Sequence, residues 1–201
     1  KPIEIDGKPV TAETTFKPKK SSGSAKVTFT FNASSLKGKT IVVFEELYQE
    51  DLKLAVHADI TDQDQTIYFP EIGTTAKDKE TDMNLSQADK EVTLVDTVAY
   101  KNLLPGEEYV MTGTLMDKET GKPVEIDKKE VTAETTFTPK ESSGTVDVIF
   151  SFDGTSLAGK TVVVFESATY DGKEFATHAD LEDNGQTIYF PEIATTAKDK
   201  A

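Results

Sequence analysis

Five polar side chains stand at positions where their types and spacing could support chemistry. Side chains two residues apart in a β-strand share a face, so VDTVAY, VVVFES and QTIYF place Thr97, Glu166 and Gln186 among apolar neighbours. His178 and Asp183 precede Gln186 by eight and three residues. This set suits an acyl transfer with the hydroxyl as nucleophile, the imidazole as base and the amide carbon as electrophile. A carboxyl kept neutral by apolar surroundings would polarise the amide carbonyl.

A purely structural interpretation competes with this chemistry. A histidine near a strand end is usually half-buried with its hydrogen bonds satisfied, and a glutamine in a strand is usually solvated. A carboxylate or amide buried without partners costs a few kcal/mol or more, so Glu166 and Gln186 on apolar faces must satisfy each other or serve a reaction.

The same set recurs earlier in the chain, as His57, Asp62, Gln65 and Glu45. Residues 1–80 match residues 122–201 without a gap at an offset of 121, a period too long for a solenoid, so each copy is a whole domain. The two histidines of the chain both occupy this repeated position.

The repeat also sets the expected domain boundaries. We expect a first domain over 1–80, a second over 81–201, and a polar linker over about 76–91. Residues 96–121 have no counterpart before residue 1, so we expect the first domain to lack its opening strands, about 25 residues. Both ends of the chain are expected to continue into a longer array.

The elements that would position these side chains are short strands. Segments such as GTVDVIFSF and KTVVVFESATY alternate with period two and are rich in β-branched and aromatic residues. Turn sequences such as LPGEE, YDGK and EDNG separate them. About seven strands in roughly 110 residues predict an all-β fold of tandem immunoglobulin-like antiparallel β-sandwich domains.

Composition excludes several classes of function. The net charge of -14 argues against nucleic-acid binding, which needs a basic face. The sequence has no apolar run long enough to span a membrane. Because the chain has no cysteine, disulfides, thiol catalysis and thiolate metal sites are excluded.

The blocks DTVAYKNLLPGEEY, SFDGTSLAGKTVVVFES and THADLEDNGQTIYFPEI resemble the Thr–Gln ester-bond domains of Gram-positive surface adhesins. The resemblance covers residues 90–201 and, without the opening strands, residues 1–80. It implies structural stalk modules, strung in tandem on extracellular proteins that are anchored to the cell wall.

The resemblance also implies roles for the site residues. In that family a threonine in the first strand attacks the carboxamide of a glutamine in the last strand, ammonia leaves, and an intramolecular ester remains. Carried over by motif, Thr97 and Gln186 form the cross-link, His178 is the base, and Glu166 and Asp183 share a proton that polarises the amide. The reaction occurs once on the protein itself, so we expect neither a multiple-turnover enzyme nor a cofactor or metal.

Four residues of the first repeat, Gln65, His57, Glu45 and Asp62, match the same pattern without a threonine partner in the chain. A strand from another segment or chain would have to complete residues 1–80. Because 96–121 runs directly into the second repeat, Thr97 is expected to pair there rather than with Gln65. The other expected partners are neighbouring repeats of the stalk.

Four alternatives stay open. A Lys–Asn isopeptide domain needs an asparagine in the last strand, whereas Asn184 lies in the EDNG turn and its counterpart is Gln63. A plain adhesive module would bind a host ligand without a cross-link. Calcium binding by the turns DITDQD and DLEDNG lacks EF-hand spacing. A hydrolase is disfavoured because no glycine-flanked nucleophile or HExxH motif occurs.

Overall fold

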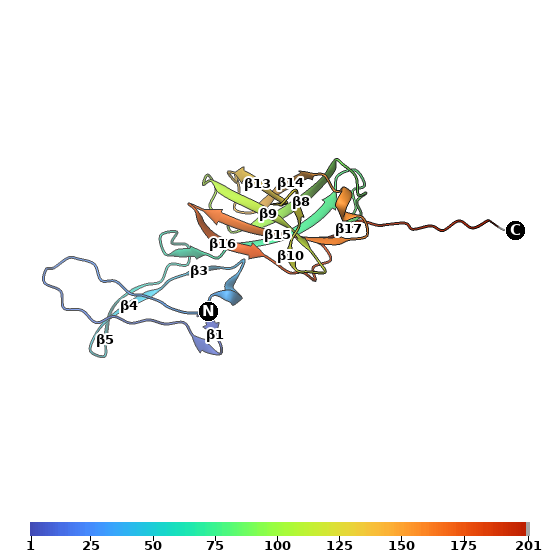
Figure 1. The fold of residues 1–201 in the computed structure, drawn as a ribbon. Helices are drawn as coiled ribbons and strands as arrows, with labels where there is room; N and C mark the ends of the chain where they lie inside the picture. Colours follow the sequence, from blue (N-terminus) through green and yellow to red (C-terminus); the bar gives the residue numbers. More distant parts are fainter. Residues whose placement is uncertain (200–201) are drawn as a thin grey trace.

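The computed structural model describes residues 1–199, which form two units joined end to end (Figure 1). Nearly all of the regular structure is β-strand, and the helices in this range are two 3-10 turns, η1 (Ser34–Leu36) and η2 (Thr155–Leu157). The predicted all-β class is therefore confirmed. Among these residues, no helix has the length and apolarity that a membrane crossing requires.

The second unit is a sandwich of two antiparallel sheets. One sheet has the strand order β14–β8–β7, and the other is built around the paired strands β9 and β15, with β10 and β13 on the far edge of β9 and β16 and β17 on the far edge of β15. The strands of this unit are β7 (Glu71–Asp78), β8 (Val92–Lys101), β9 (Tyr109–Asp117), β10 (Lys122–Pro123), β11 (Glu125–Ile126), β12 (Lys129–Glu130), β13 (Thr132–Phe137), β14 (Gly144–Phe152), β15 (Thr161–Tyr170), β16 (Lys173–His178) and β17 (Thr187–Tyr189).

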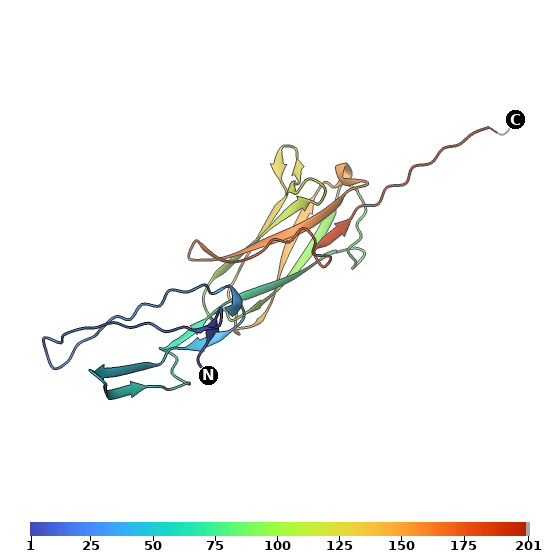
Figure 2. The same ribbon diagram turned by 90° about the horizontal axis from the view of Figure 1, so that it is seen from below.

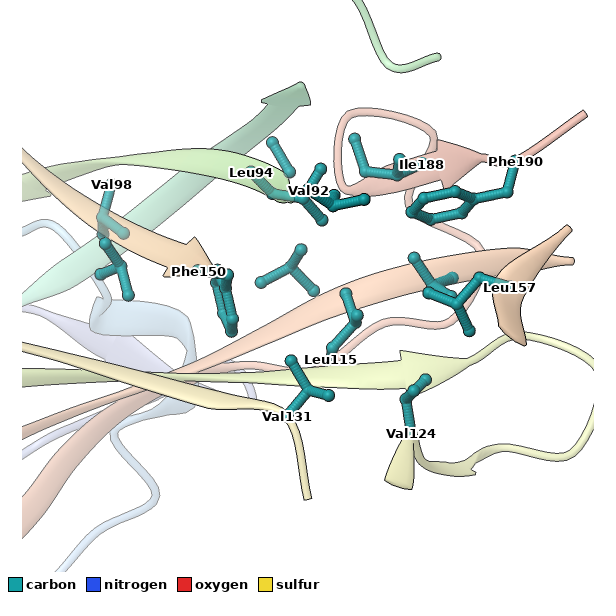
Figure 3. Packing of buried hydrophobic residues seen from close by; sticks show 14 of the residues in the cluster. Val92, Leu94, Val98, Leu115, Val124, Val131, Phe150, Leu157, Ile188 and Phe190 are labelled. Atoms are coloured by element: carbon teal, nitrogen blue, oxygen red, sulfur yellow. The ribbon is translucent and has the colours of Figure 1, made fainter. Parts of the chain in front are cut away.

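The core lies between these two sheets and consists of inward-facing aliphatic and aromatic side chains (Figure 3). Leu94, Val98 and Phe150 face it from the three-stranded sheet, and Leu115 faces it from β9. A Cβ atom at Gly113 of β9 would come within 2.5 Å of the Phe150 ring. A glycine at this position therefore lets the ring pack directly on the β9 backbone.

Strand β7 corrects the expected domain boundary. Its residues pair with β8 from Glu71↔Lys101 to Asp78↔Leu94, so 71–78 belong to the sandwich of the second unit and not to the first unit or to a linker. The segment that follows is also tied down, because the buried Asp78 carboxylate accepts a hydrogen bond from Ser86 Oγ at 2.7 Å. The sequence EIGTTAKD is short and polar enough to be taken for a linker, although every second side chain faces inward.

The first unit, residues 1–69, contains short strands that pair only with one another, in three separate two-stranded sheets (Figure 2). It matches 122–190 and has no counterpart of β7, β8 or β9, and residues 10–33 form neither helix nor strand. The three pairs are β1 (Glu4–Ile5) with β2 (Lys8–Pro9), β3 (Thr40–Val42) with β6 (Thr66–Tyr68), and β4 (Glu45–Gln49) with β5 (Leu52–His57).

The segment that follows β17 repeats the sequence of β7. Residues 192–199 read EIATTAKD, against EIGTTAKD in 71–78. They contain no helix or strand and run away from the sandwich as an extended chain (Figure 1). The same sequence is thus a paired strand at one end of the second unit and an unpaired segment at the other.

Candidate functional site

Three polar side chains meet inside the second sandwich, from strands distant in sequence. Asp96 lies on β8, Glu166 on β15, and Gln186 directly precedes β17. Their exposed fractions are 0%, 2% and 0%. The Gln186 Nε2 group donates hydrogen bonds to Asp96 Oδ1 at 3.1 Å and to Glu166 Oε1 at 3.0 Å. The carboxamide therefore sits between two buried carboxyl groups.

Burial changes the protonation of this carboxyl pair. Burial raises the pKa of Asp96, and burial followed by the negative charge of Asp96 raises the pKa of Glu166 to about 10. Asp96 Oδ2 and Glu166 Oε2 are buried and have no hydrogen-bond partner. Two adjacent carboxylates cannot both stay ionised in an apolar site, so at neutral pH the pair retains a proton.

A threonine hydroxyl completes the cluster from β7. Thr74 points inward from the sheet, and its Oγ1 atom is buried without a hydrogen-bond partner. It lies near Glu166, since it is among the groups that lower the pKa of that carboxyl. Strand β7 is fixed beside Gln186 because Ala76 N donates to Gly185 O at 2.9 Å. The Thr74 Oγ1 and Gln186 Oε1 atoms are thus both buried, and Glu166 lies near both side chains.

His178 lies at the rim of the cluster. It is paired in register with Glu166 across β15 and β16, so the two side chains share a face of the sheet. Its Nε2 atom is 2.7 Å from Asp183 Oδ2. Asp183 Oδ1 in turn accepts the Gly185 amide at 2.7 Å, and the Asp183 carbonyl accepts the Thr187 hydroxyl at 2.7 Å. These bonds hold the loop that presents Gln186.

Two expectations about this site are wrong. Asp183 contacts His178, and the carboxyl that accompanies Glu166 is Asp96. Thr97 lies on the outer face of β8, where its Oγ1 donates to Asp147 Oδ1 at 2.8 Å, so it does not face Gln186. The sequence pattern predicts that Thr97 faces inward and Asp96 outward, whereas in β8 the two side chains have the opposite orientation.

The chain also matches a family model. The model of the T-Q ester bond containing domain matches residues 3–69 and 70–190. The chain belongs to this family. The second match begins at residue 70, directly before β7, and ends directly after β17. The matched segment 70–190 therefore includes the Thr74 strand at its start.

Two solved structures similar to this T-Q ester bond chain are crystal forms of a bacterial adhesin from Mobiluncus mulieris that contains intramolecular disulfide, isopeptide and ester bond cross-links. The first is 16% identical, with a TM-score of 0.49 over 61% of this chain and 57% of that one. The second is 17% identical, with a TM-score of 0.46 over 59% and 56%. The chain thus matches just over half of the length of either adhesin structure. A search of curated proteins returned no match.

The T-Q ester bond segment 3–69 holds only part of the site. His57 Nε2 is 2.7 Å from Asp62 Oδ2, as in the second unit, and Glu45 pairs with His57 in register. Glu45 and Gln65 are both half-buried. Counterparts of Thr74 and Asp96 would precede Lys1 in the repeat register. This segment therefore holds the counterparts of the four residues Glu166, His178, Asp183 and Gln186 but not those of Thr74 and Asp96.

The cluster around Gln186 consists of oxygen and nitrogen groups. Across residues 1–199, the structure shows no group of three or more His, Cys, Asp or Glu side chains arranged to hold a metal ion. The neighbours of Gln186 include the apolar residues Val164 and Ile188, which are both fully buried. The site can therefore bring a hydroxyl and an amide together in a dry environment.

Proposed function

We propose that the unit 70–190 forms an intramolecular ester between Thr74 Oγ1 and the side-chain carbonyl carbon of Gln186. The observation that carries this proposal is the buried Thr74 hydroxyl without a partner, held beside a buried carboxamide and a carboxyl pair that retains a proton. Such groups are costly to bury unsatisfied, and the reaction accounts for their presence together.

The reaction balances without a cofactor. Thr74 Oγ1 attacks the Gln186 carbonyl carbon while His178 takes the hydroxyl proton. A half-turn of the carboxamide exchanges its oxygen and nitrogen, so that the oxygen accepts a hydrogen bond from protonated Glu166, which stabilises the developing charge. The carbon–nitrogen bond then breaks, the proton passes from His178 to the leaving nitrogen, and ammonia departs.

Two further roles follow from the contacts. Asp96 keeps the proton on Glu166 through its own negative charge, and Asp183 orients the His178 imidazole through the 2.7 Å contact. Both reacting side chains are consumed, so the reaction takes place once per molecule and involves no turnover. The dry surroundings protect the ester from hydrolysis.

The position of the bond suggests the biological role. Thr74 is on the first strand of the unit and Gln186 immediately precedes the last, so the ester would connect the two ends at which a pulling force is applied. We propose that the chain is a structural stalk module of a bacterial surface adhesin, extracellular and anchored to the cell wall as part of a longer protein. Its partners along the stalk would be neighbouring repeats.

Intact mass tests the bond and its residues. The wild-type chain is expected to weigh ~17 Da less than its sequence, one ammonia lost, and Thr74→Ala is expected to restore the full mass. Thr75→Ala is the matched control because its side chain points outward from the same strand. Thr97→Ala should also keep the deficit. A deficit that survives Thr74→Ala and disappears in Thr97→Ala would overturn the assignment, and no deficit in folded wild type would overturn the cross-link.

The bond should also contribute to stability. Closing a loop of about 110 residues covalently is worth roughly 5 kcal/mol by analogy with disulfides, so Thr74→Ala should lower the free energy of unfolding of this unit by that order. Urea unfolding, followed by the tyrosine fluorescence of the chain, measures it against Thr75→Ala. Equal stability of Thr74→Ala and Thr75→Ala would contradict a stabilising cross-link at Thr74.

A further inference from the structure

One side chain of the second unit fastens the end of the first. Asn102 directly follows β8, in a left-handed backbone conformation with φ of 62°. Its Nδ2 group donates to the Lys39 carbonyl at 3.1 Å and to the Phe69 carbonyl at 3.2 Å. A carboxamide nitrogen carries two hydrogens, so both are used in bridging the two units.

The acceptors belong to a small ring of backbone hydrogen bonds at the end of the first unit. Gly38 N donates to Phe69 O at 3.0 Å, and Phe69 N donates to Lys39 O at 3.0 Å. A carbonyl oxygen accepts two hydrogen bonds. The ring therefore leaves one acceptor position on each of these carbonyls for Asn102.

The second unit ends in the same ring. Gly159 N donates to Phe190 O at 2.8 Å, and Phe190 N donates to Lys160 O at 2.9 Å. The two ends differ in what covers them, because Gly38 is buried at the joint whereas its counterpart Gly159 is exposed. Both units therefore end in the same pair of carbonyl acceptors. Within residues 1–199, only the pair at the end of the first unit is covered by another unit.

We propose that this distal end of the second unit, defined by Gly159, Lys160 and Phe190, is the docking surface for a following T-Q ester bond domain. Its recognition element would be an asparagine equivalent to Asn102, bonded to the Lys160 and Phe190 carbonyls. The inference goes beyond the ester and does not depend on it, since the joint at Asn102 contains none of the reacting groups.

The chain path indicates this occupant. Strand β7 starts two residues after Phe69, and its pairing with β8 brings the end of β8 back to the first unit, with Lys101 opposite Glu71. Residues 192–199 leave Phe190 in the same way and repeat the β7 sequence. A following β8 paired with them would return its asparagine to the Phe190 carbonyl.

The existing joint can be tested in the full chain. Because the chain has no cysteine, Asp51→Cys and Thr145→Cys at exposed positions give one spin label on each unit. Asn102→Ala and Asn102→Asp, which cannot donate to either carbonyl, are expected to broaden the distance distribution at least twofold. Lys101→Ala, an exposed neighbour, should leave it unchanged. Unchanged widths in both Asn102 variants would overturn the bridge.

The distal surface needs a chain that continues past it. A second copy of residues 79–190 placed after Asp199 lets 192–199 act as the first strand of a third unit. With labels on the second and third units, we expect a narrow distribution that broadens at least twofold when the asparagine of the added copy becomes alanine. An additional mass loss of ~17 Da shows that the added unit has folded and reacted. A folded third unit with a broad distribution in both forms would overturn the docking surface.

Discussion

Residues 1–69 and 122–190 have closely similar sequences and very different structures. Strand β14 forms a nine-residue ladder with β8, whereas its counterpart, residues 23–31, contains no strand. Phe150 on β14 is 1% exposed, and its counterpart Phe29 is only half-buried. The difference lies in the missing counterparts of β7, β8 and β9, because a strand needs a neighbour for its backbone groups and its apolar face.

Hairpins that pair with themselves are common to both segments. The pair β4/β5 corresponds to β15/β16, and both shift register at the same place, after Leu47 and after Ala168. By contrast, the counterpart of β15 is interrupted at residues 43–44, and the matching residues Val164 and Phe165 pair with β9. Local pairing is therefore encoded within each hairpin, while the sandwich depends on strands contributed from outside the segment.

Supplying the missing strands should remove the difference, which is the largest effect we expect. Placing a copy of residues 70–121 in front of residue 1 should turn 1–69 into a second sandwich, since every strand of the second unit would then have its counterpart. The mass deficit should double to ~34 Da, one ammonia per unit. Replacing the added Thr74 by alanine should remove only the new half. A deficit that stays at one ammonia in a folded product would show that the two segments differ by more than their partners.

A matched pair of core truncations probes the same contrast. Phe150→Ala is expected to destabilise the second unit by about 3–5 kcal/mol, the usual cost of removing a buried aromatic side chain. Phe29→Ala, the same change in the first segment, should leave the unfolding transition of the second unit within roughly 0.5 kcal/mol of the parent. Urea unfolding in the Thr74→Ala background measures both. Similar losses would mean that the first segment packs far better than its exposure indicates.

The effect of pH on stability is the smallest when it is expressed per pH unit. Because burial raises the folded-state pKa of Glu166 to about 10, the folded unit binds a proton that the unfolded chain releases above its ordinary value of 4.5. The stability of uncross-linked Thr74→Ala should therefore fall as pH rises between about 5 and 10, by at most ~1.4 kcal/mol per pH unit. Adding Glu166→Gln should flatten this dependence, while Glu45→Gln serves as the matched control. A slope that persists after Glu166→Gln would assign it to another group.

Much of the site could be predicted from sequence, because part of it is encoded by short-range pattern. Glu166 and Gln186 were placed on apolar faces by alternation alone, and both are buried. His178 and Asp183 belong to one turn and are in contact, but the role given to Asp183 was wrong because spacing does not show which carboxyl faces which partner. The all-β class followed from the same alternation.

Asp96 and Thr74 could not be predicted in this way, because the alternation of apolar and polar residues is weak in their strands. In β8 the two faces differ little, and the stronger apolar row of Leu94 and Val98 was the signal that Asp96 points inward. Thr74 was missed because EIGTTAKD contains few apolar residues and its partner strand is identified only by the tertiary structure. The repetition of this sequence after each YFP was the available sign that it is a structural element.

The arrangement of β7 directly after the preceding unit has a consequence for extensibility. A tie between Thr74 and Gln186 removes the chain between them, about 110 residues or roughly 370 Å of contour length, from the path that carries tension. The path from Gln186 to Thr195, the counterpart of Thr74, is only nine residues, or about 30 Å when fully extended. A fibre of such units would lengthen under load only through these short connectors, and would behave as a nearly inextensible cord rather than as a chain of unfolding springs.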